Sequence, residues 1–206
     1  MLNEMLNETK DFWESKYQSG NTRWDLGKAA PPLVSLLSSP DAPAPGKTVV
    51  LGCGRGYDAL LFANHGFEVT GVDLAPSAIT AAKSSAAKAN LSVKFLLRNI
   101  FDLTAEFPNY FDYVVEHTCF CAIAPELRKK YLNLVTSLLK PQGKLIGVFF
   151  THNRPSGPPF GSTPQEIRDL FSGELQIRRL DPVTNSVPSR QNEEHLGIFK
   201  KRVEID

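Results

Sequence analysis

Three glycines stand at alternate positions, Gly52, Gly54 and Gly56, directly after an apolar run at residues 48–51. Glycine at the end of a buried strand lets a ligand approach the backbone, and the N–H groups that open the next helix face that ligand. We therefore interpret all three glycines as a cofactor loop and not as packing positions. A plain tight turn is the alternative.

A carboxylate stands at Asp73, where the next apolar run ends. In a parallel sheet of this kind, a carboxylate at that position accepts hydrogen bonds from the hydroxyls of a ribose. The same side chain could instead cap the helix that begins at "PSAI". Together, the glycine loop and Asp73 indicate a ligand that carries a nucleoside.

The spacing of the glycines separates two kinds of cofactor. A dinucleotide loop has the pattern GxGxxG, in which the last glycine lets helix and strand pack closely. Here the pattern is GxGxG, and Tyr57 stands at the place of that last glycine. A bulky side chain there argues against a bound pyrophosphate. S-adenosylmethionine (SAM) has a ribose and a base but no phosphate, so it fits better than NAD, and an NAD-dependent oxidoreductase is the weaker alternative.

Two further residues are placed beside the adenine of such a ligand. Asn99 and Ile100 end the third apolar run, and they would offer a polar edge contact and an apolar face. A strand-end turn without a ligand role explains the same residues equally well.

Aromatic residues of the N-terminal segment predict a lid over the cofactor. Trp13 and Tyr17 are spaced i, i+4 and share one face of a helix, and Trp24 follows shortly after. Aromatic faces attract a cationic centre such as the sulfonium of SAM. An amphipathic helix whose aromatic residues only fill the core is the alternative.

His117 is the candidate catalytic residue, because it follows the fourth apolar run at the edge where such sheets bind ligands. An imidazole there could deprotonate a thiol or hold a small anion, although a structural role is the alternative. Phe150 and Phe160 flank a loop rich in proline and glycine, and we expect them to form apolar walls of the acceptor pocket.

The three cysteines, Cys53, Cys119 and Cys121, match neither a disulfide framework nor a zinc site. Cys119 and Cys121 could bind a metalloid, but cysteines in an apolar run are more typical of small hydrophobic residues. We therefore expect no metal and a reducing compartment.

Short apolar runs alternate with helical segments, which predicts a mainly parallel α/β sheet. The final two runs are joined by a loop, so they are expected to pair antiparallel. Strands are predicted at residues 47–52, 67–73, 93–99, 111–117, 144–150, 175–181 and 195–203, and helices at residues 57–66, 74–90, 124–143 and 163–171.

The length, net charge and apolar segments of the chain indicate its domain organisation and its partners. The 206 residues fit one domain, 1–206, in which residues 1–46 form lid helices and a linker and residues 47–206 form the core. A formal net charge of +1 without a basic, aromatic-rich stretch disfavours nucleic acid as a partner. With no signal-like or membrane-spanning apolar segment, we expect a soluble, cytoplasmic protein. The oligomeric state does not follow from the sequence.

Longer motifs carry a family resemblance over nearly the whole length. The chain resembles the thiopurine S-methyltransferase superfamily, and within it the halide/thiol methyltransferases of plants and microbes. The resemblance implies a Rossmann-like, seven-stranded sheet of the class I SAM-dependent methyltransferases with an antiparallel C-terminal edge. It rests on "FWESKYQSGNTRWDLG", "LGCGRGYD", "GVDLAPSAI", "HTCFCAIAPELR" and "SGPPFGSTPQEIRDLF".

The same resemblance implies where SAM binds. Related enzymes often have Trp at the place of Tyr17, Tyr at the place of His117 and an acidic residue at the place of Asn99, so the acceptor side departs from the family pattern. The implied cofactor contacts are Trp13, Tyr17, Trp24, Gly52, Gly54, Asp73, Asn99, Ile100 and His117.

The expected activity is methyl transfer (EC 2.1.1) from SAM to a small soft nucleophile, namely a thiol, bisulfide or a halide such as iodide. The alternatives are another small acceptor, such as a thiopurine or a metalloid, and a SAM-binding module without transfer activity. A nucleobase amino-methyltransferase is disfavoured, because such enzymes carry an Asp/Asn-Pro-Pro-aromatic motif after the fourth strand. In this chain the fourth strand leads into "EHTCF", and the similar "GPPF" follows the fifth strand instead.

Overall fold

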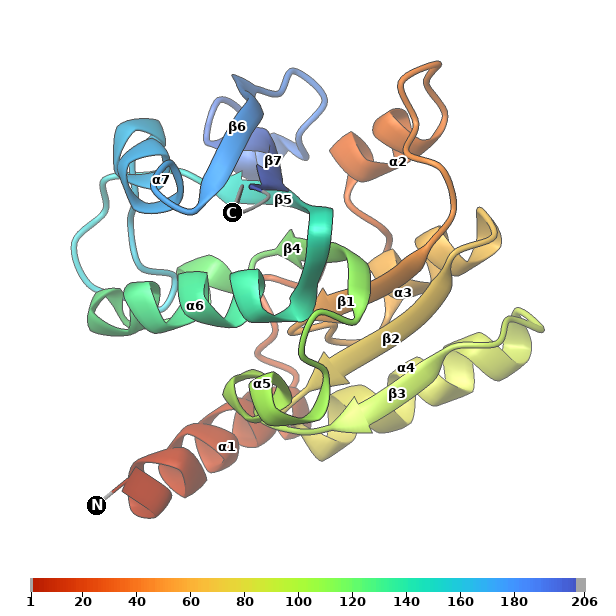
Figure 1. Cartoon of the computed structure of the whole chain (residues 1–206). Coiled ribbons are helices and arrows are strands. Elements are labelled where there is room, and N and C mark those ends of the chain that lie inside the picture. Colours follow the sequence, from red (N-terminus) through yellow and green to blue (C-terminus); the bar gives the residue numbers. More distant parts are fainter. Residues whose placement is uncertain (1, 203–206) are drawn as a thin grey trace.

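A computed structural model describes the backbone of residues 2–202 and the side chains of residues 9–202. Seven strands form one sheet in the order β3-β2-β1-β4-β5-β7-β6 (Figure 1). The strands are β1 (Lys47–Leu51), β2 (Glu68–Asp73), β3 (Lys94–Leu97), β4 (Phe111–His117), β5 (Leu139–Phe150), β6 (Leu175–Pro182) and β7 (Glu194–Lys201).

Seven α-helices and four short 3-10 helices connect and cover the strands in the described part of the chain. The α-helices are α1 (Leu2–Gln18), α2 (Pro31–Leu37), α3 (Tyr57–Asn64), α4 (Pro76–Lys88), α5 (Leu103–Glu106), α6 (Arg128–Leu138) and α7 (Pro164–Phe171), and the 3-10 helices are η1 (Ile100–Asp102), η2 (Phe120–Ala122), η3 (Pro125–Leu127) and η4 (Pro188–Arg190).

Strand directions confirm the expected topology. β1 pairs parallel with β2 and β4, and β2–β3 and β4–β5 are also parallel. β7 runs antiparallel to both β5 and β6, so the C-terminal edge is antiparallel as predicted. The predicted end of the last strand at residue 203 lies outside the described residues.

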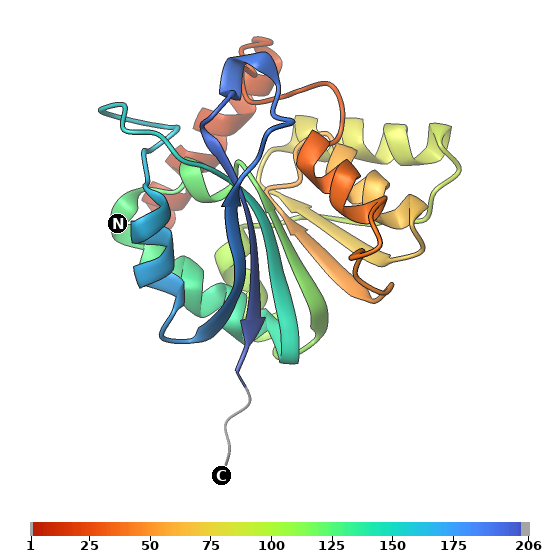
Figure 2. The same ribbon diagram turned by 90° about the horizontal axis from the view of Figure 1, so that it is seen from above.

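The sheet separates two apolar layers, because its central strands are buried on both faces. Helices α2, α3 and α4 cover one face, where Leu33, Phe62 and Ala82 are buried. Helices α6 and α7 cover the other face with Tyr131 and Phe171 (Figure 2). Both layers meet at β1 and β4, whose carboxyl ends carry the glycine loop and His117.

One predicted helix was too long. The prediction placed the stop of this helix at "KPQG", residues 140–143, whereas α6 ends at Leu138 and β5 begins at Leu139. Pro141 explains the early end, because proline cannot continue a helix and biases the residue before it toward extended backbone. The short elements η1 and α5 between β3 and β4 were not predicted.

The last α-helix begins at a capping box, as the sequence indicates. Thr163 Oγ1 accepts from Glu166 N, and Glu166 accepts from Thr163 N. Among the described residues, no helix is both long and apolar enough to cross a membrane.

Candidate functional site

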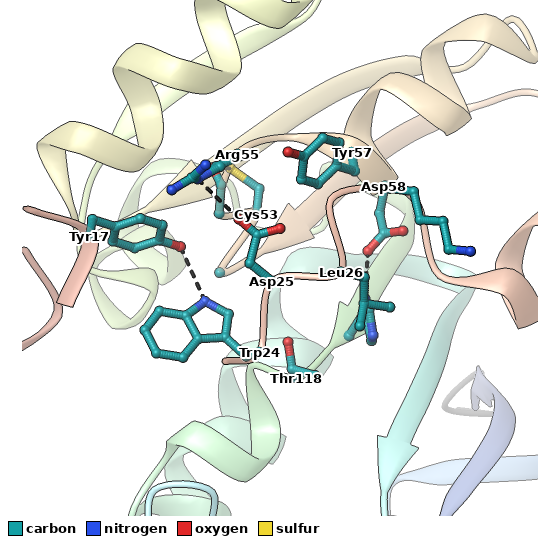
Figure 3. Close-up of a pocket in the computed structure, with 13 residues that line it drawn as sticks. Tyr17, Trp24, Asp25, Leu26, Cys53, Arg55, Tyr57, Asp58 and Thr118 are labelled. Carbon is teal, nitrogen blue, oxygen red and sulfur yellow. Dashed lines mark hydrogen bonds and ion pairs between the residues drawn. The ribbon is translucent and has the colours of Figure 1, made fainter. Parts of the chain in front are cut away.

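A pocket of about 400 Å³, partly open to solvent, lies between the glycine loop, the start of α3, the end of β4 and the segment after α1 (Figure 3). This volume includes solvent at the open mouth of the pocket. The pocket is lined by Tyr17, Trp24, Asp25, Leu26, Lys28, Gly52, Cys53, Gly54, Arg55, Tyr57, Asp58, His117 and Thr118.

The three glycines have positive φ angles of 58°, 52° and 86°, a conformation that side chains rarely adopt. A Cβ on Gly52 would lie 2.9 Å from Cys119 Sγ, whereas a Cβ on Gly54 would meet only Tyr17 Oη, at 3.1 Å. The hydroxyl at the end of the Tyr17 side chain therefore lies close against the backbone of Gly54.

Gly56 corrects the interpretation of the loop. A Cβ there would lie 3.0 Å from Ala82 Cβ on α4 and 3.2 Å from the Phe95 ring on β3. Gly56 is therefore needed for packing, and the prediction that none of the three glycines is a packing position is wrong for this residue. The close approach of helix and strand uses Gly56 itself, so Tyr57 is free to line the pocket as the first residue of α3.

Asp73 joins the end of β2 to the loops on either side. Its Oδ2 accepts from Gly54 N at 2.8 Å, and its Oδ1 accepts from Ala75 N at 2.9 Å before α4. Asp73 is 9% exposed, and burial raises the pKa of its carboxyl group above the usual value. The backbone of Leu74 also hydrogen-bonds to this carboxyl group, so three of its about four acceptor positions are used within the protein.

The predicted lid aromatics lie together. Trp24 packs edge-to-face against Trp13 and Tyr17, with ring centroids 5.2 and 5.6 Å away, and its Nε1 donates to Tyr17 Oη at 3.4 Å (Figure 3). Burial raises the pKa of Tyr17, so its hydroxyl stays protonated. Tyr17 and Trp24 line the pocket. Trp13 does not line it and instead packs against Trp24.

Polar contacts fix this aromatic segment to the core. Glu14 on α1 accepts from the N and Oγ of Ser77, in the first turn of α4, at 3.0 and 2.5 Å. Beside the pocket, Asp25 pairs with Arg55 of the glycine loop at 3.0 Å (Figure 3).

Both ring nitrogens of His117 have partners. Nδ1 lies 2.8 Å from Asp58 Oδ2, and Nε2 lies 3.0 Å from Arg190 Nη1. Arginine can only donate, so Nε2 is the acceptor and Nδ1 carries the proton toward Asp58. Burial lowers the pKa of His117, but the Asp58 carboxylate outweighs it, and the net pKa is raised.

Arg190 is the functional residue that the sequence analysis missed. It is 5% exposed and also contacts Glu194 Oε1 at 3.2 Å and the carbonyl oxygen of Trp24 at 2.7 Å. Its guanidinium lies 5.6 Å from the centre of the Phe150 ring. The sequence gives only a weak signal for this role, because Arg190 is simply an arginine in the loop between two predicted strands.

Asn99 and Ile100 follow the end of β3, and the Asn99 side chain forms a local hydrogen bond. Its Oδ1 accepts from Phe101 N at 3.0 Å and caps η1, and Ile100 packs against the core. The strand-end turn is therefore present. Adenine contact by these two residues stays a prediction, which the second lone pair of Oδ1 permits.

The loop after β5 is held at both ends. Phe160 N donates to Cys121 O at 2.6 Å, Arg128 donates to Gly161 O at 2.7 Å, and Arg154 forms an ion pair with Glu193. Phe150 lies between the Arg190 guanidinium and the His152 ring, whose centroid is 4.7 Å away. The His152 side chain is buried beneath this loop's contacts.

The cysteines behave as apolar residues. Burial raises the pKa of Cys53 and Cys119, and it raises that of Cys121 to about 12, so all three remain thiols. No group of three or more metal-binding side chains occurs within the described chain.

Beneath the site, Glu116 is an unusual buried acid. Its Oε2 accepts from Phe120 N at 2.9 Å and from Tyr131 Oη at 3.3 Å, whereas Oε1 has no hydrogen-bond partner in the described part of the chain. Burial raises the pKa of Glu116 to about 7.

These residues suit a nucleoside with a cationic chain. Gly54, the aromatic side chains of Tyr17 and Trp24, and His117 line one pocket, and Asp73 contacts Gly54 without lining the pocket itself. The apolar ring of Phe150 and the cation of Arg190 lie at its His117 end.

The chain is similar to known proteins over nearly its whole length. The family model for thiopurine S-methyltransferase (TPMT) matches residues 8–205. The "Probable thiol methyltransferase 2" of Arabidopsis thaliana is 32% identical over 202 residues, 96% of this chain and 88% of that protein. "Thiocyanate methyltransferase 1" of the same plant is 31% identical over 196 residues, 92% of this chain and 84% of that protein.

The fold has a close counterpart among solved structures. The 1,6-didemethyltoxoflavin-N1-methyltransferase of Burkholderia thailandensis, determined with 1,6-didemethyltoxoflavin and S-adenosylhomocysteine, superimposes with a TM-score of 0.79. The superposition covers 98% of this chain and 90% of that one at 21% sequence identity.

Proposed function

The chain belongs to the thiopurine S-methyltransferase family, and from this premise we propose that it transfers the methyl group of SAM to a small, soft nucleophile: a thiol, bisulfide or a halide such as iodide. Relatives named for thiol and thiocyanate methyl transfer support an acceptor of this class. The observation that carries the proposal is the pocket that joins the glycine loop and aromatic lid to His117.

The cofactor half of the pocket would bind the nucleoside. Gly54 lines the pocket, Asp73 would accept from a ribose hydroxyl, and Tyr17 and Trp24 would cover the cationic side. Asn99 and Ile100 would flank the adenine, and Trp13 would support Trp24.

When bound, SAM supplies a methyl group on a positively charged sulfur, which is already an electrophile. The remaining task for the protein is to align the acceptor and exclude water. The Phe150 ring would remove water from the acceptor, and Phe160 would complete the apolar wall. Arg190 lies next to His117 at this end, with its charge compensated by Glu194.

His117 would help to position the acceptor and would not act as a base. Its Nε2 lone pair faces Arg190, so it is unavailable for a thiol proton while that contact lasts. An acceptor that is already an anion needs no base, which suits a halide, bisulfide or an acidic thiol.

The decisive experiment combines binding with product detection. SAM and S-adenosylhomocysteine should raise the melting temperature, whereas NAD should not, because only a ligand of the folded state stabilises it. Headspace analysis with iodide, bisulfide and small thiols should then detect methyl iodide or a methyl sulfide. Stabilisation by NAD alone would overturn the cofactor assignment. Binding of SAM without any methylated product would favour a SAM-binding module.

A further inference from the structure

Four hydrogen bonds form a closed path that begins and ends on one segment of the lid. The backbone N–H of Ala30 donates to Asp58 Oδ1 at 2.8 Å, and Asp58 Oδ2 lies 2.8 Å from His117 Nδ1. His117 Nε2 accepts from Arg190 at 3.0 Å, and Arg190 Nη2 donates to the carbonyl oxygen of Trp24 at 2.7 Å. Residues 24–30 are thus held at both ends by three side chains from α3, β4 and η4.

The three side chains are almost completely enclosed. The side chains of Asp58, His117 and Arg190 are 12%, 8% and 6% exposed, and that of Glu194, which pairs with Arg190, is 2% exposed. In such surroundings, removing one partner of a charged pair is strongly destabilising, because it leaves an uncompensated buried charge. The path is therefore a strong connection between the lid and the core.

We propose that Asp58, His117 and Arg190 form a latch that closes residues 24–30 over the pocket, and that protonation of His117 releases it. The three are positioning residues, acting on the cofactor through the lid and not on the transferred methyl group. The proposal rests on the proposed function only in taking the pocket beneath the lid as the cofactor site.

The release follows from the hydrogen-bond roles. With His117 neutral, Nδ1 donates to Asp58 and Nε2 accepts from Arg190. A proton on Nε2 would place an N–H group against the guanidinium N–H groups, so Arg190 must move, and its contact with the Trp24 carbonyl oxygen is weakened.

The charges around His117 set the balance between the two states. Asp58 on α3 and Glu194 on β7 favour the protonated ring, and Arg190 after β6 opposes it. Glu116, the preceding residue on β4, also favours the protonated ring when its own carboxyl group is ionised. Because the net pKa of His117 is raised, release should begin at mildly acidic pH and not only in strong acid.

The sequence provides a built-in probe of the lid. The chain has two tryptophans, Trp13 and Trp24, and both belong to this aromatic cluster. Acrylamide quenching of tryptophan fluorescence therefore reports the accessibility of the lid alone. For the wild type, we expect the quenching constant to increase as the pH falls from about 8 to about 5.5, across the titration of a histidine.

Three variants test the latch. Asp58→Asn and Arg190→Lys should increase the quenching constant roughly twofold or more at pH 8, since each breaks a buried charged contact. A lysine cannot donate to His117 and the Trp24 carbonyl oxygen with the fixed fork of arginine. His117→Gln has no titratable ring, so it should abolish the pH dependence. Arg179→Lys, in an exposed ion pair on β6, is the matched control and should resemble the wild type.

A second readout separates a latch from a loss of fold. Circular dichroism and the melting temperature establish folding, and the dissociation rate of S-adenosylhomocysteine should increase in the latch variants and at low pH. Equal quenching in the wild type and folded variants, independent of pH, would overturn the latch. If no adenosyl ligand binds the wild type, the proposed function fails, but the quenching result still decides the latch. If Arg190→Lys does not fold, His117→Gln decides it.

Discussion

Asp73 Oδ2 accepts a hydrogen bond from the backbone N–H of Gly54 at 2.8 Å, which joins the carboxyl end of β2 to the loop after β1. One side chain thereby shapes the glycine loop and, under the proposed function, would also accept from a ribose. The structural and binding roles of this carboxylate are inseparable, since the loop bends around the group that would hold the ligand.

Replacing Asp73 should therefore impair both stability and SAM binding. Asp73→Ala removes hydrogen bonds to a charged acceptor, worth about 1.5–3 kcal/mol each, so we expect at least about tenfold weaker SAM binding in calorimetric titration. Asp112→Ala is the control, because Asp112 accepts from Lys47 N at 2.8 Å at the other end of β1. It should lower the melting temperature without changing SAM affinity, and equal losses of affinity would contradict a ribose contact.

The aromatic lid should contribute directly to cofactor affinity. Trp24→Leu should weaken SAM binding by roughly 3–30-fold, because a desolvated cation–π contact is worth about 0.5–2 kcal/mol and edge-to-face packing is also lost. Phe12→Leu is the control on α1, since Phe12 is 40% exposed. If both variants bind SAM like the wild type in equilibrium dialysis, the aromatic cluster only fills space.

Glu116 predicts a specific pH dependence of stability. Its pKa is about 7 in the folded protein and lower in the unfolded chain, so the folded state binds the extra proton. This contribution is fully present below the unfolded pKa and is lost as the pH rises through about 7. Melting temperatures measured between about pH 5 and pH 8.5 should fall by several degrees in the wild type, since 1 kcal/mol corresponds to about 2–4 °C at this size.

Glu116→Gln should flatten that profile, because the amide does not titrate. Glu68→Gln, at an exposed side chain of β2, should retain the wild-type slope. A slope that persists unchanged in Glu116→Gln would assign the effect to another group.

The apolar wall should affect the acceptor and not SAM. Phe150→Leu reduces contact with His152 and Arg190, so we expect the KM for the acceptor to increase several-fold while the Kd of SAM stays unchanged. Phe107→Leu, in an aromatic group with Tyr110 and Phe111 at the other end of β4, is the control. A changed SAM Kd with an unchanged acceptor KM would place Phe150 in the cofactor half.

Local patterns were sufficient for most of the fold. Strand-length apolar runs, the "TPQE" capping box and the loop between the last two strands each depend on neighbouring residues, and all are present in the structure. The end of α6 also has a local cause, because Pro141 in the stop "KPQG" biases the residue before it toward extended backbone, and the helix ends shortly before that segment.

The site was predicted less completely, because its contacts connect distant residues. The positions of Asp73 and the lid aromatics follow from motifs, but the pairing of His117 with Asp58 and Arg190 spans 59 and 73 positions and has no local signature. Gly56 shows the same limit, since the need for glycine comes from Ala82 and Phe95 on two other elements.

The hydrogen bond from Arg190 to the Trp24 carbonyl oxygen connects residues 166 positions apart. A ribosome synthesises the lid long before the arginine, so a nascent chain has its glycine loop and Asp73 before Arg190 can hold the lid. Under the proposed function, full-strength cofactor binding would then wait until β7 has paired with β5, since β7 anchors the loop that carries Arg190. Truncated translation products would consequently compete poorly with the finished protein for scarce cofactor.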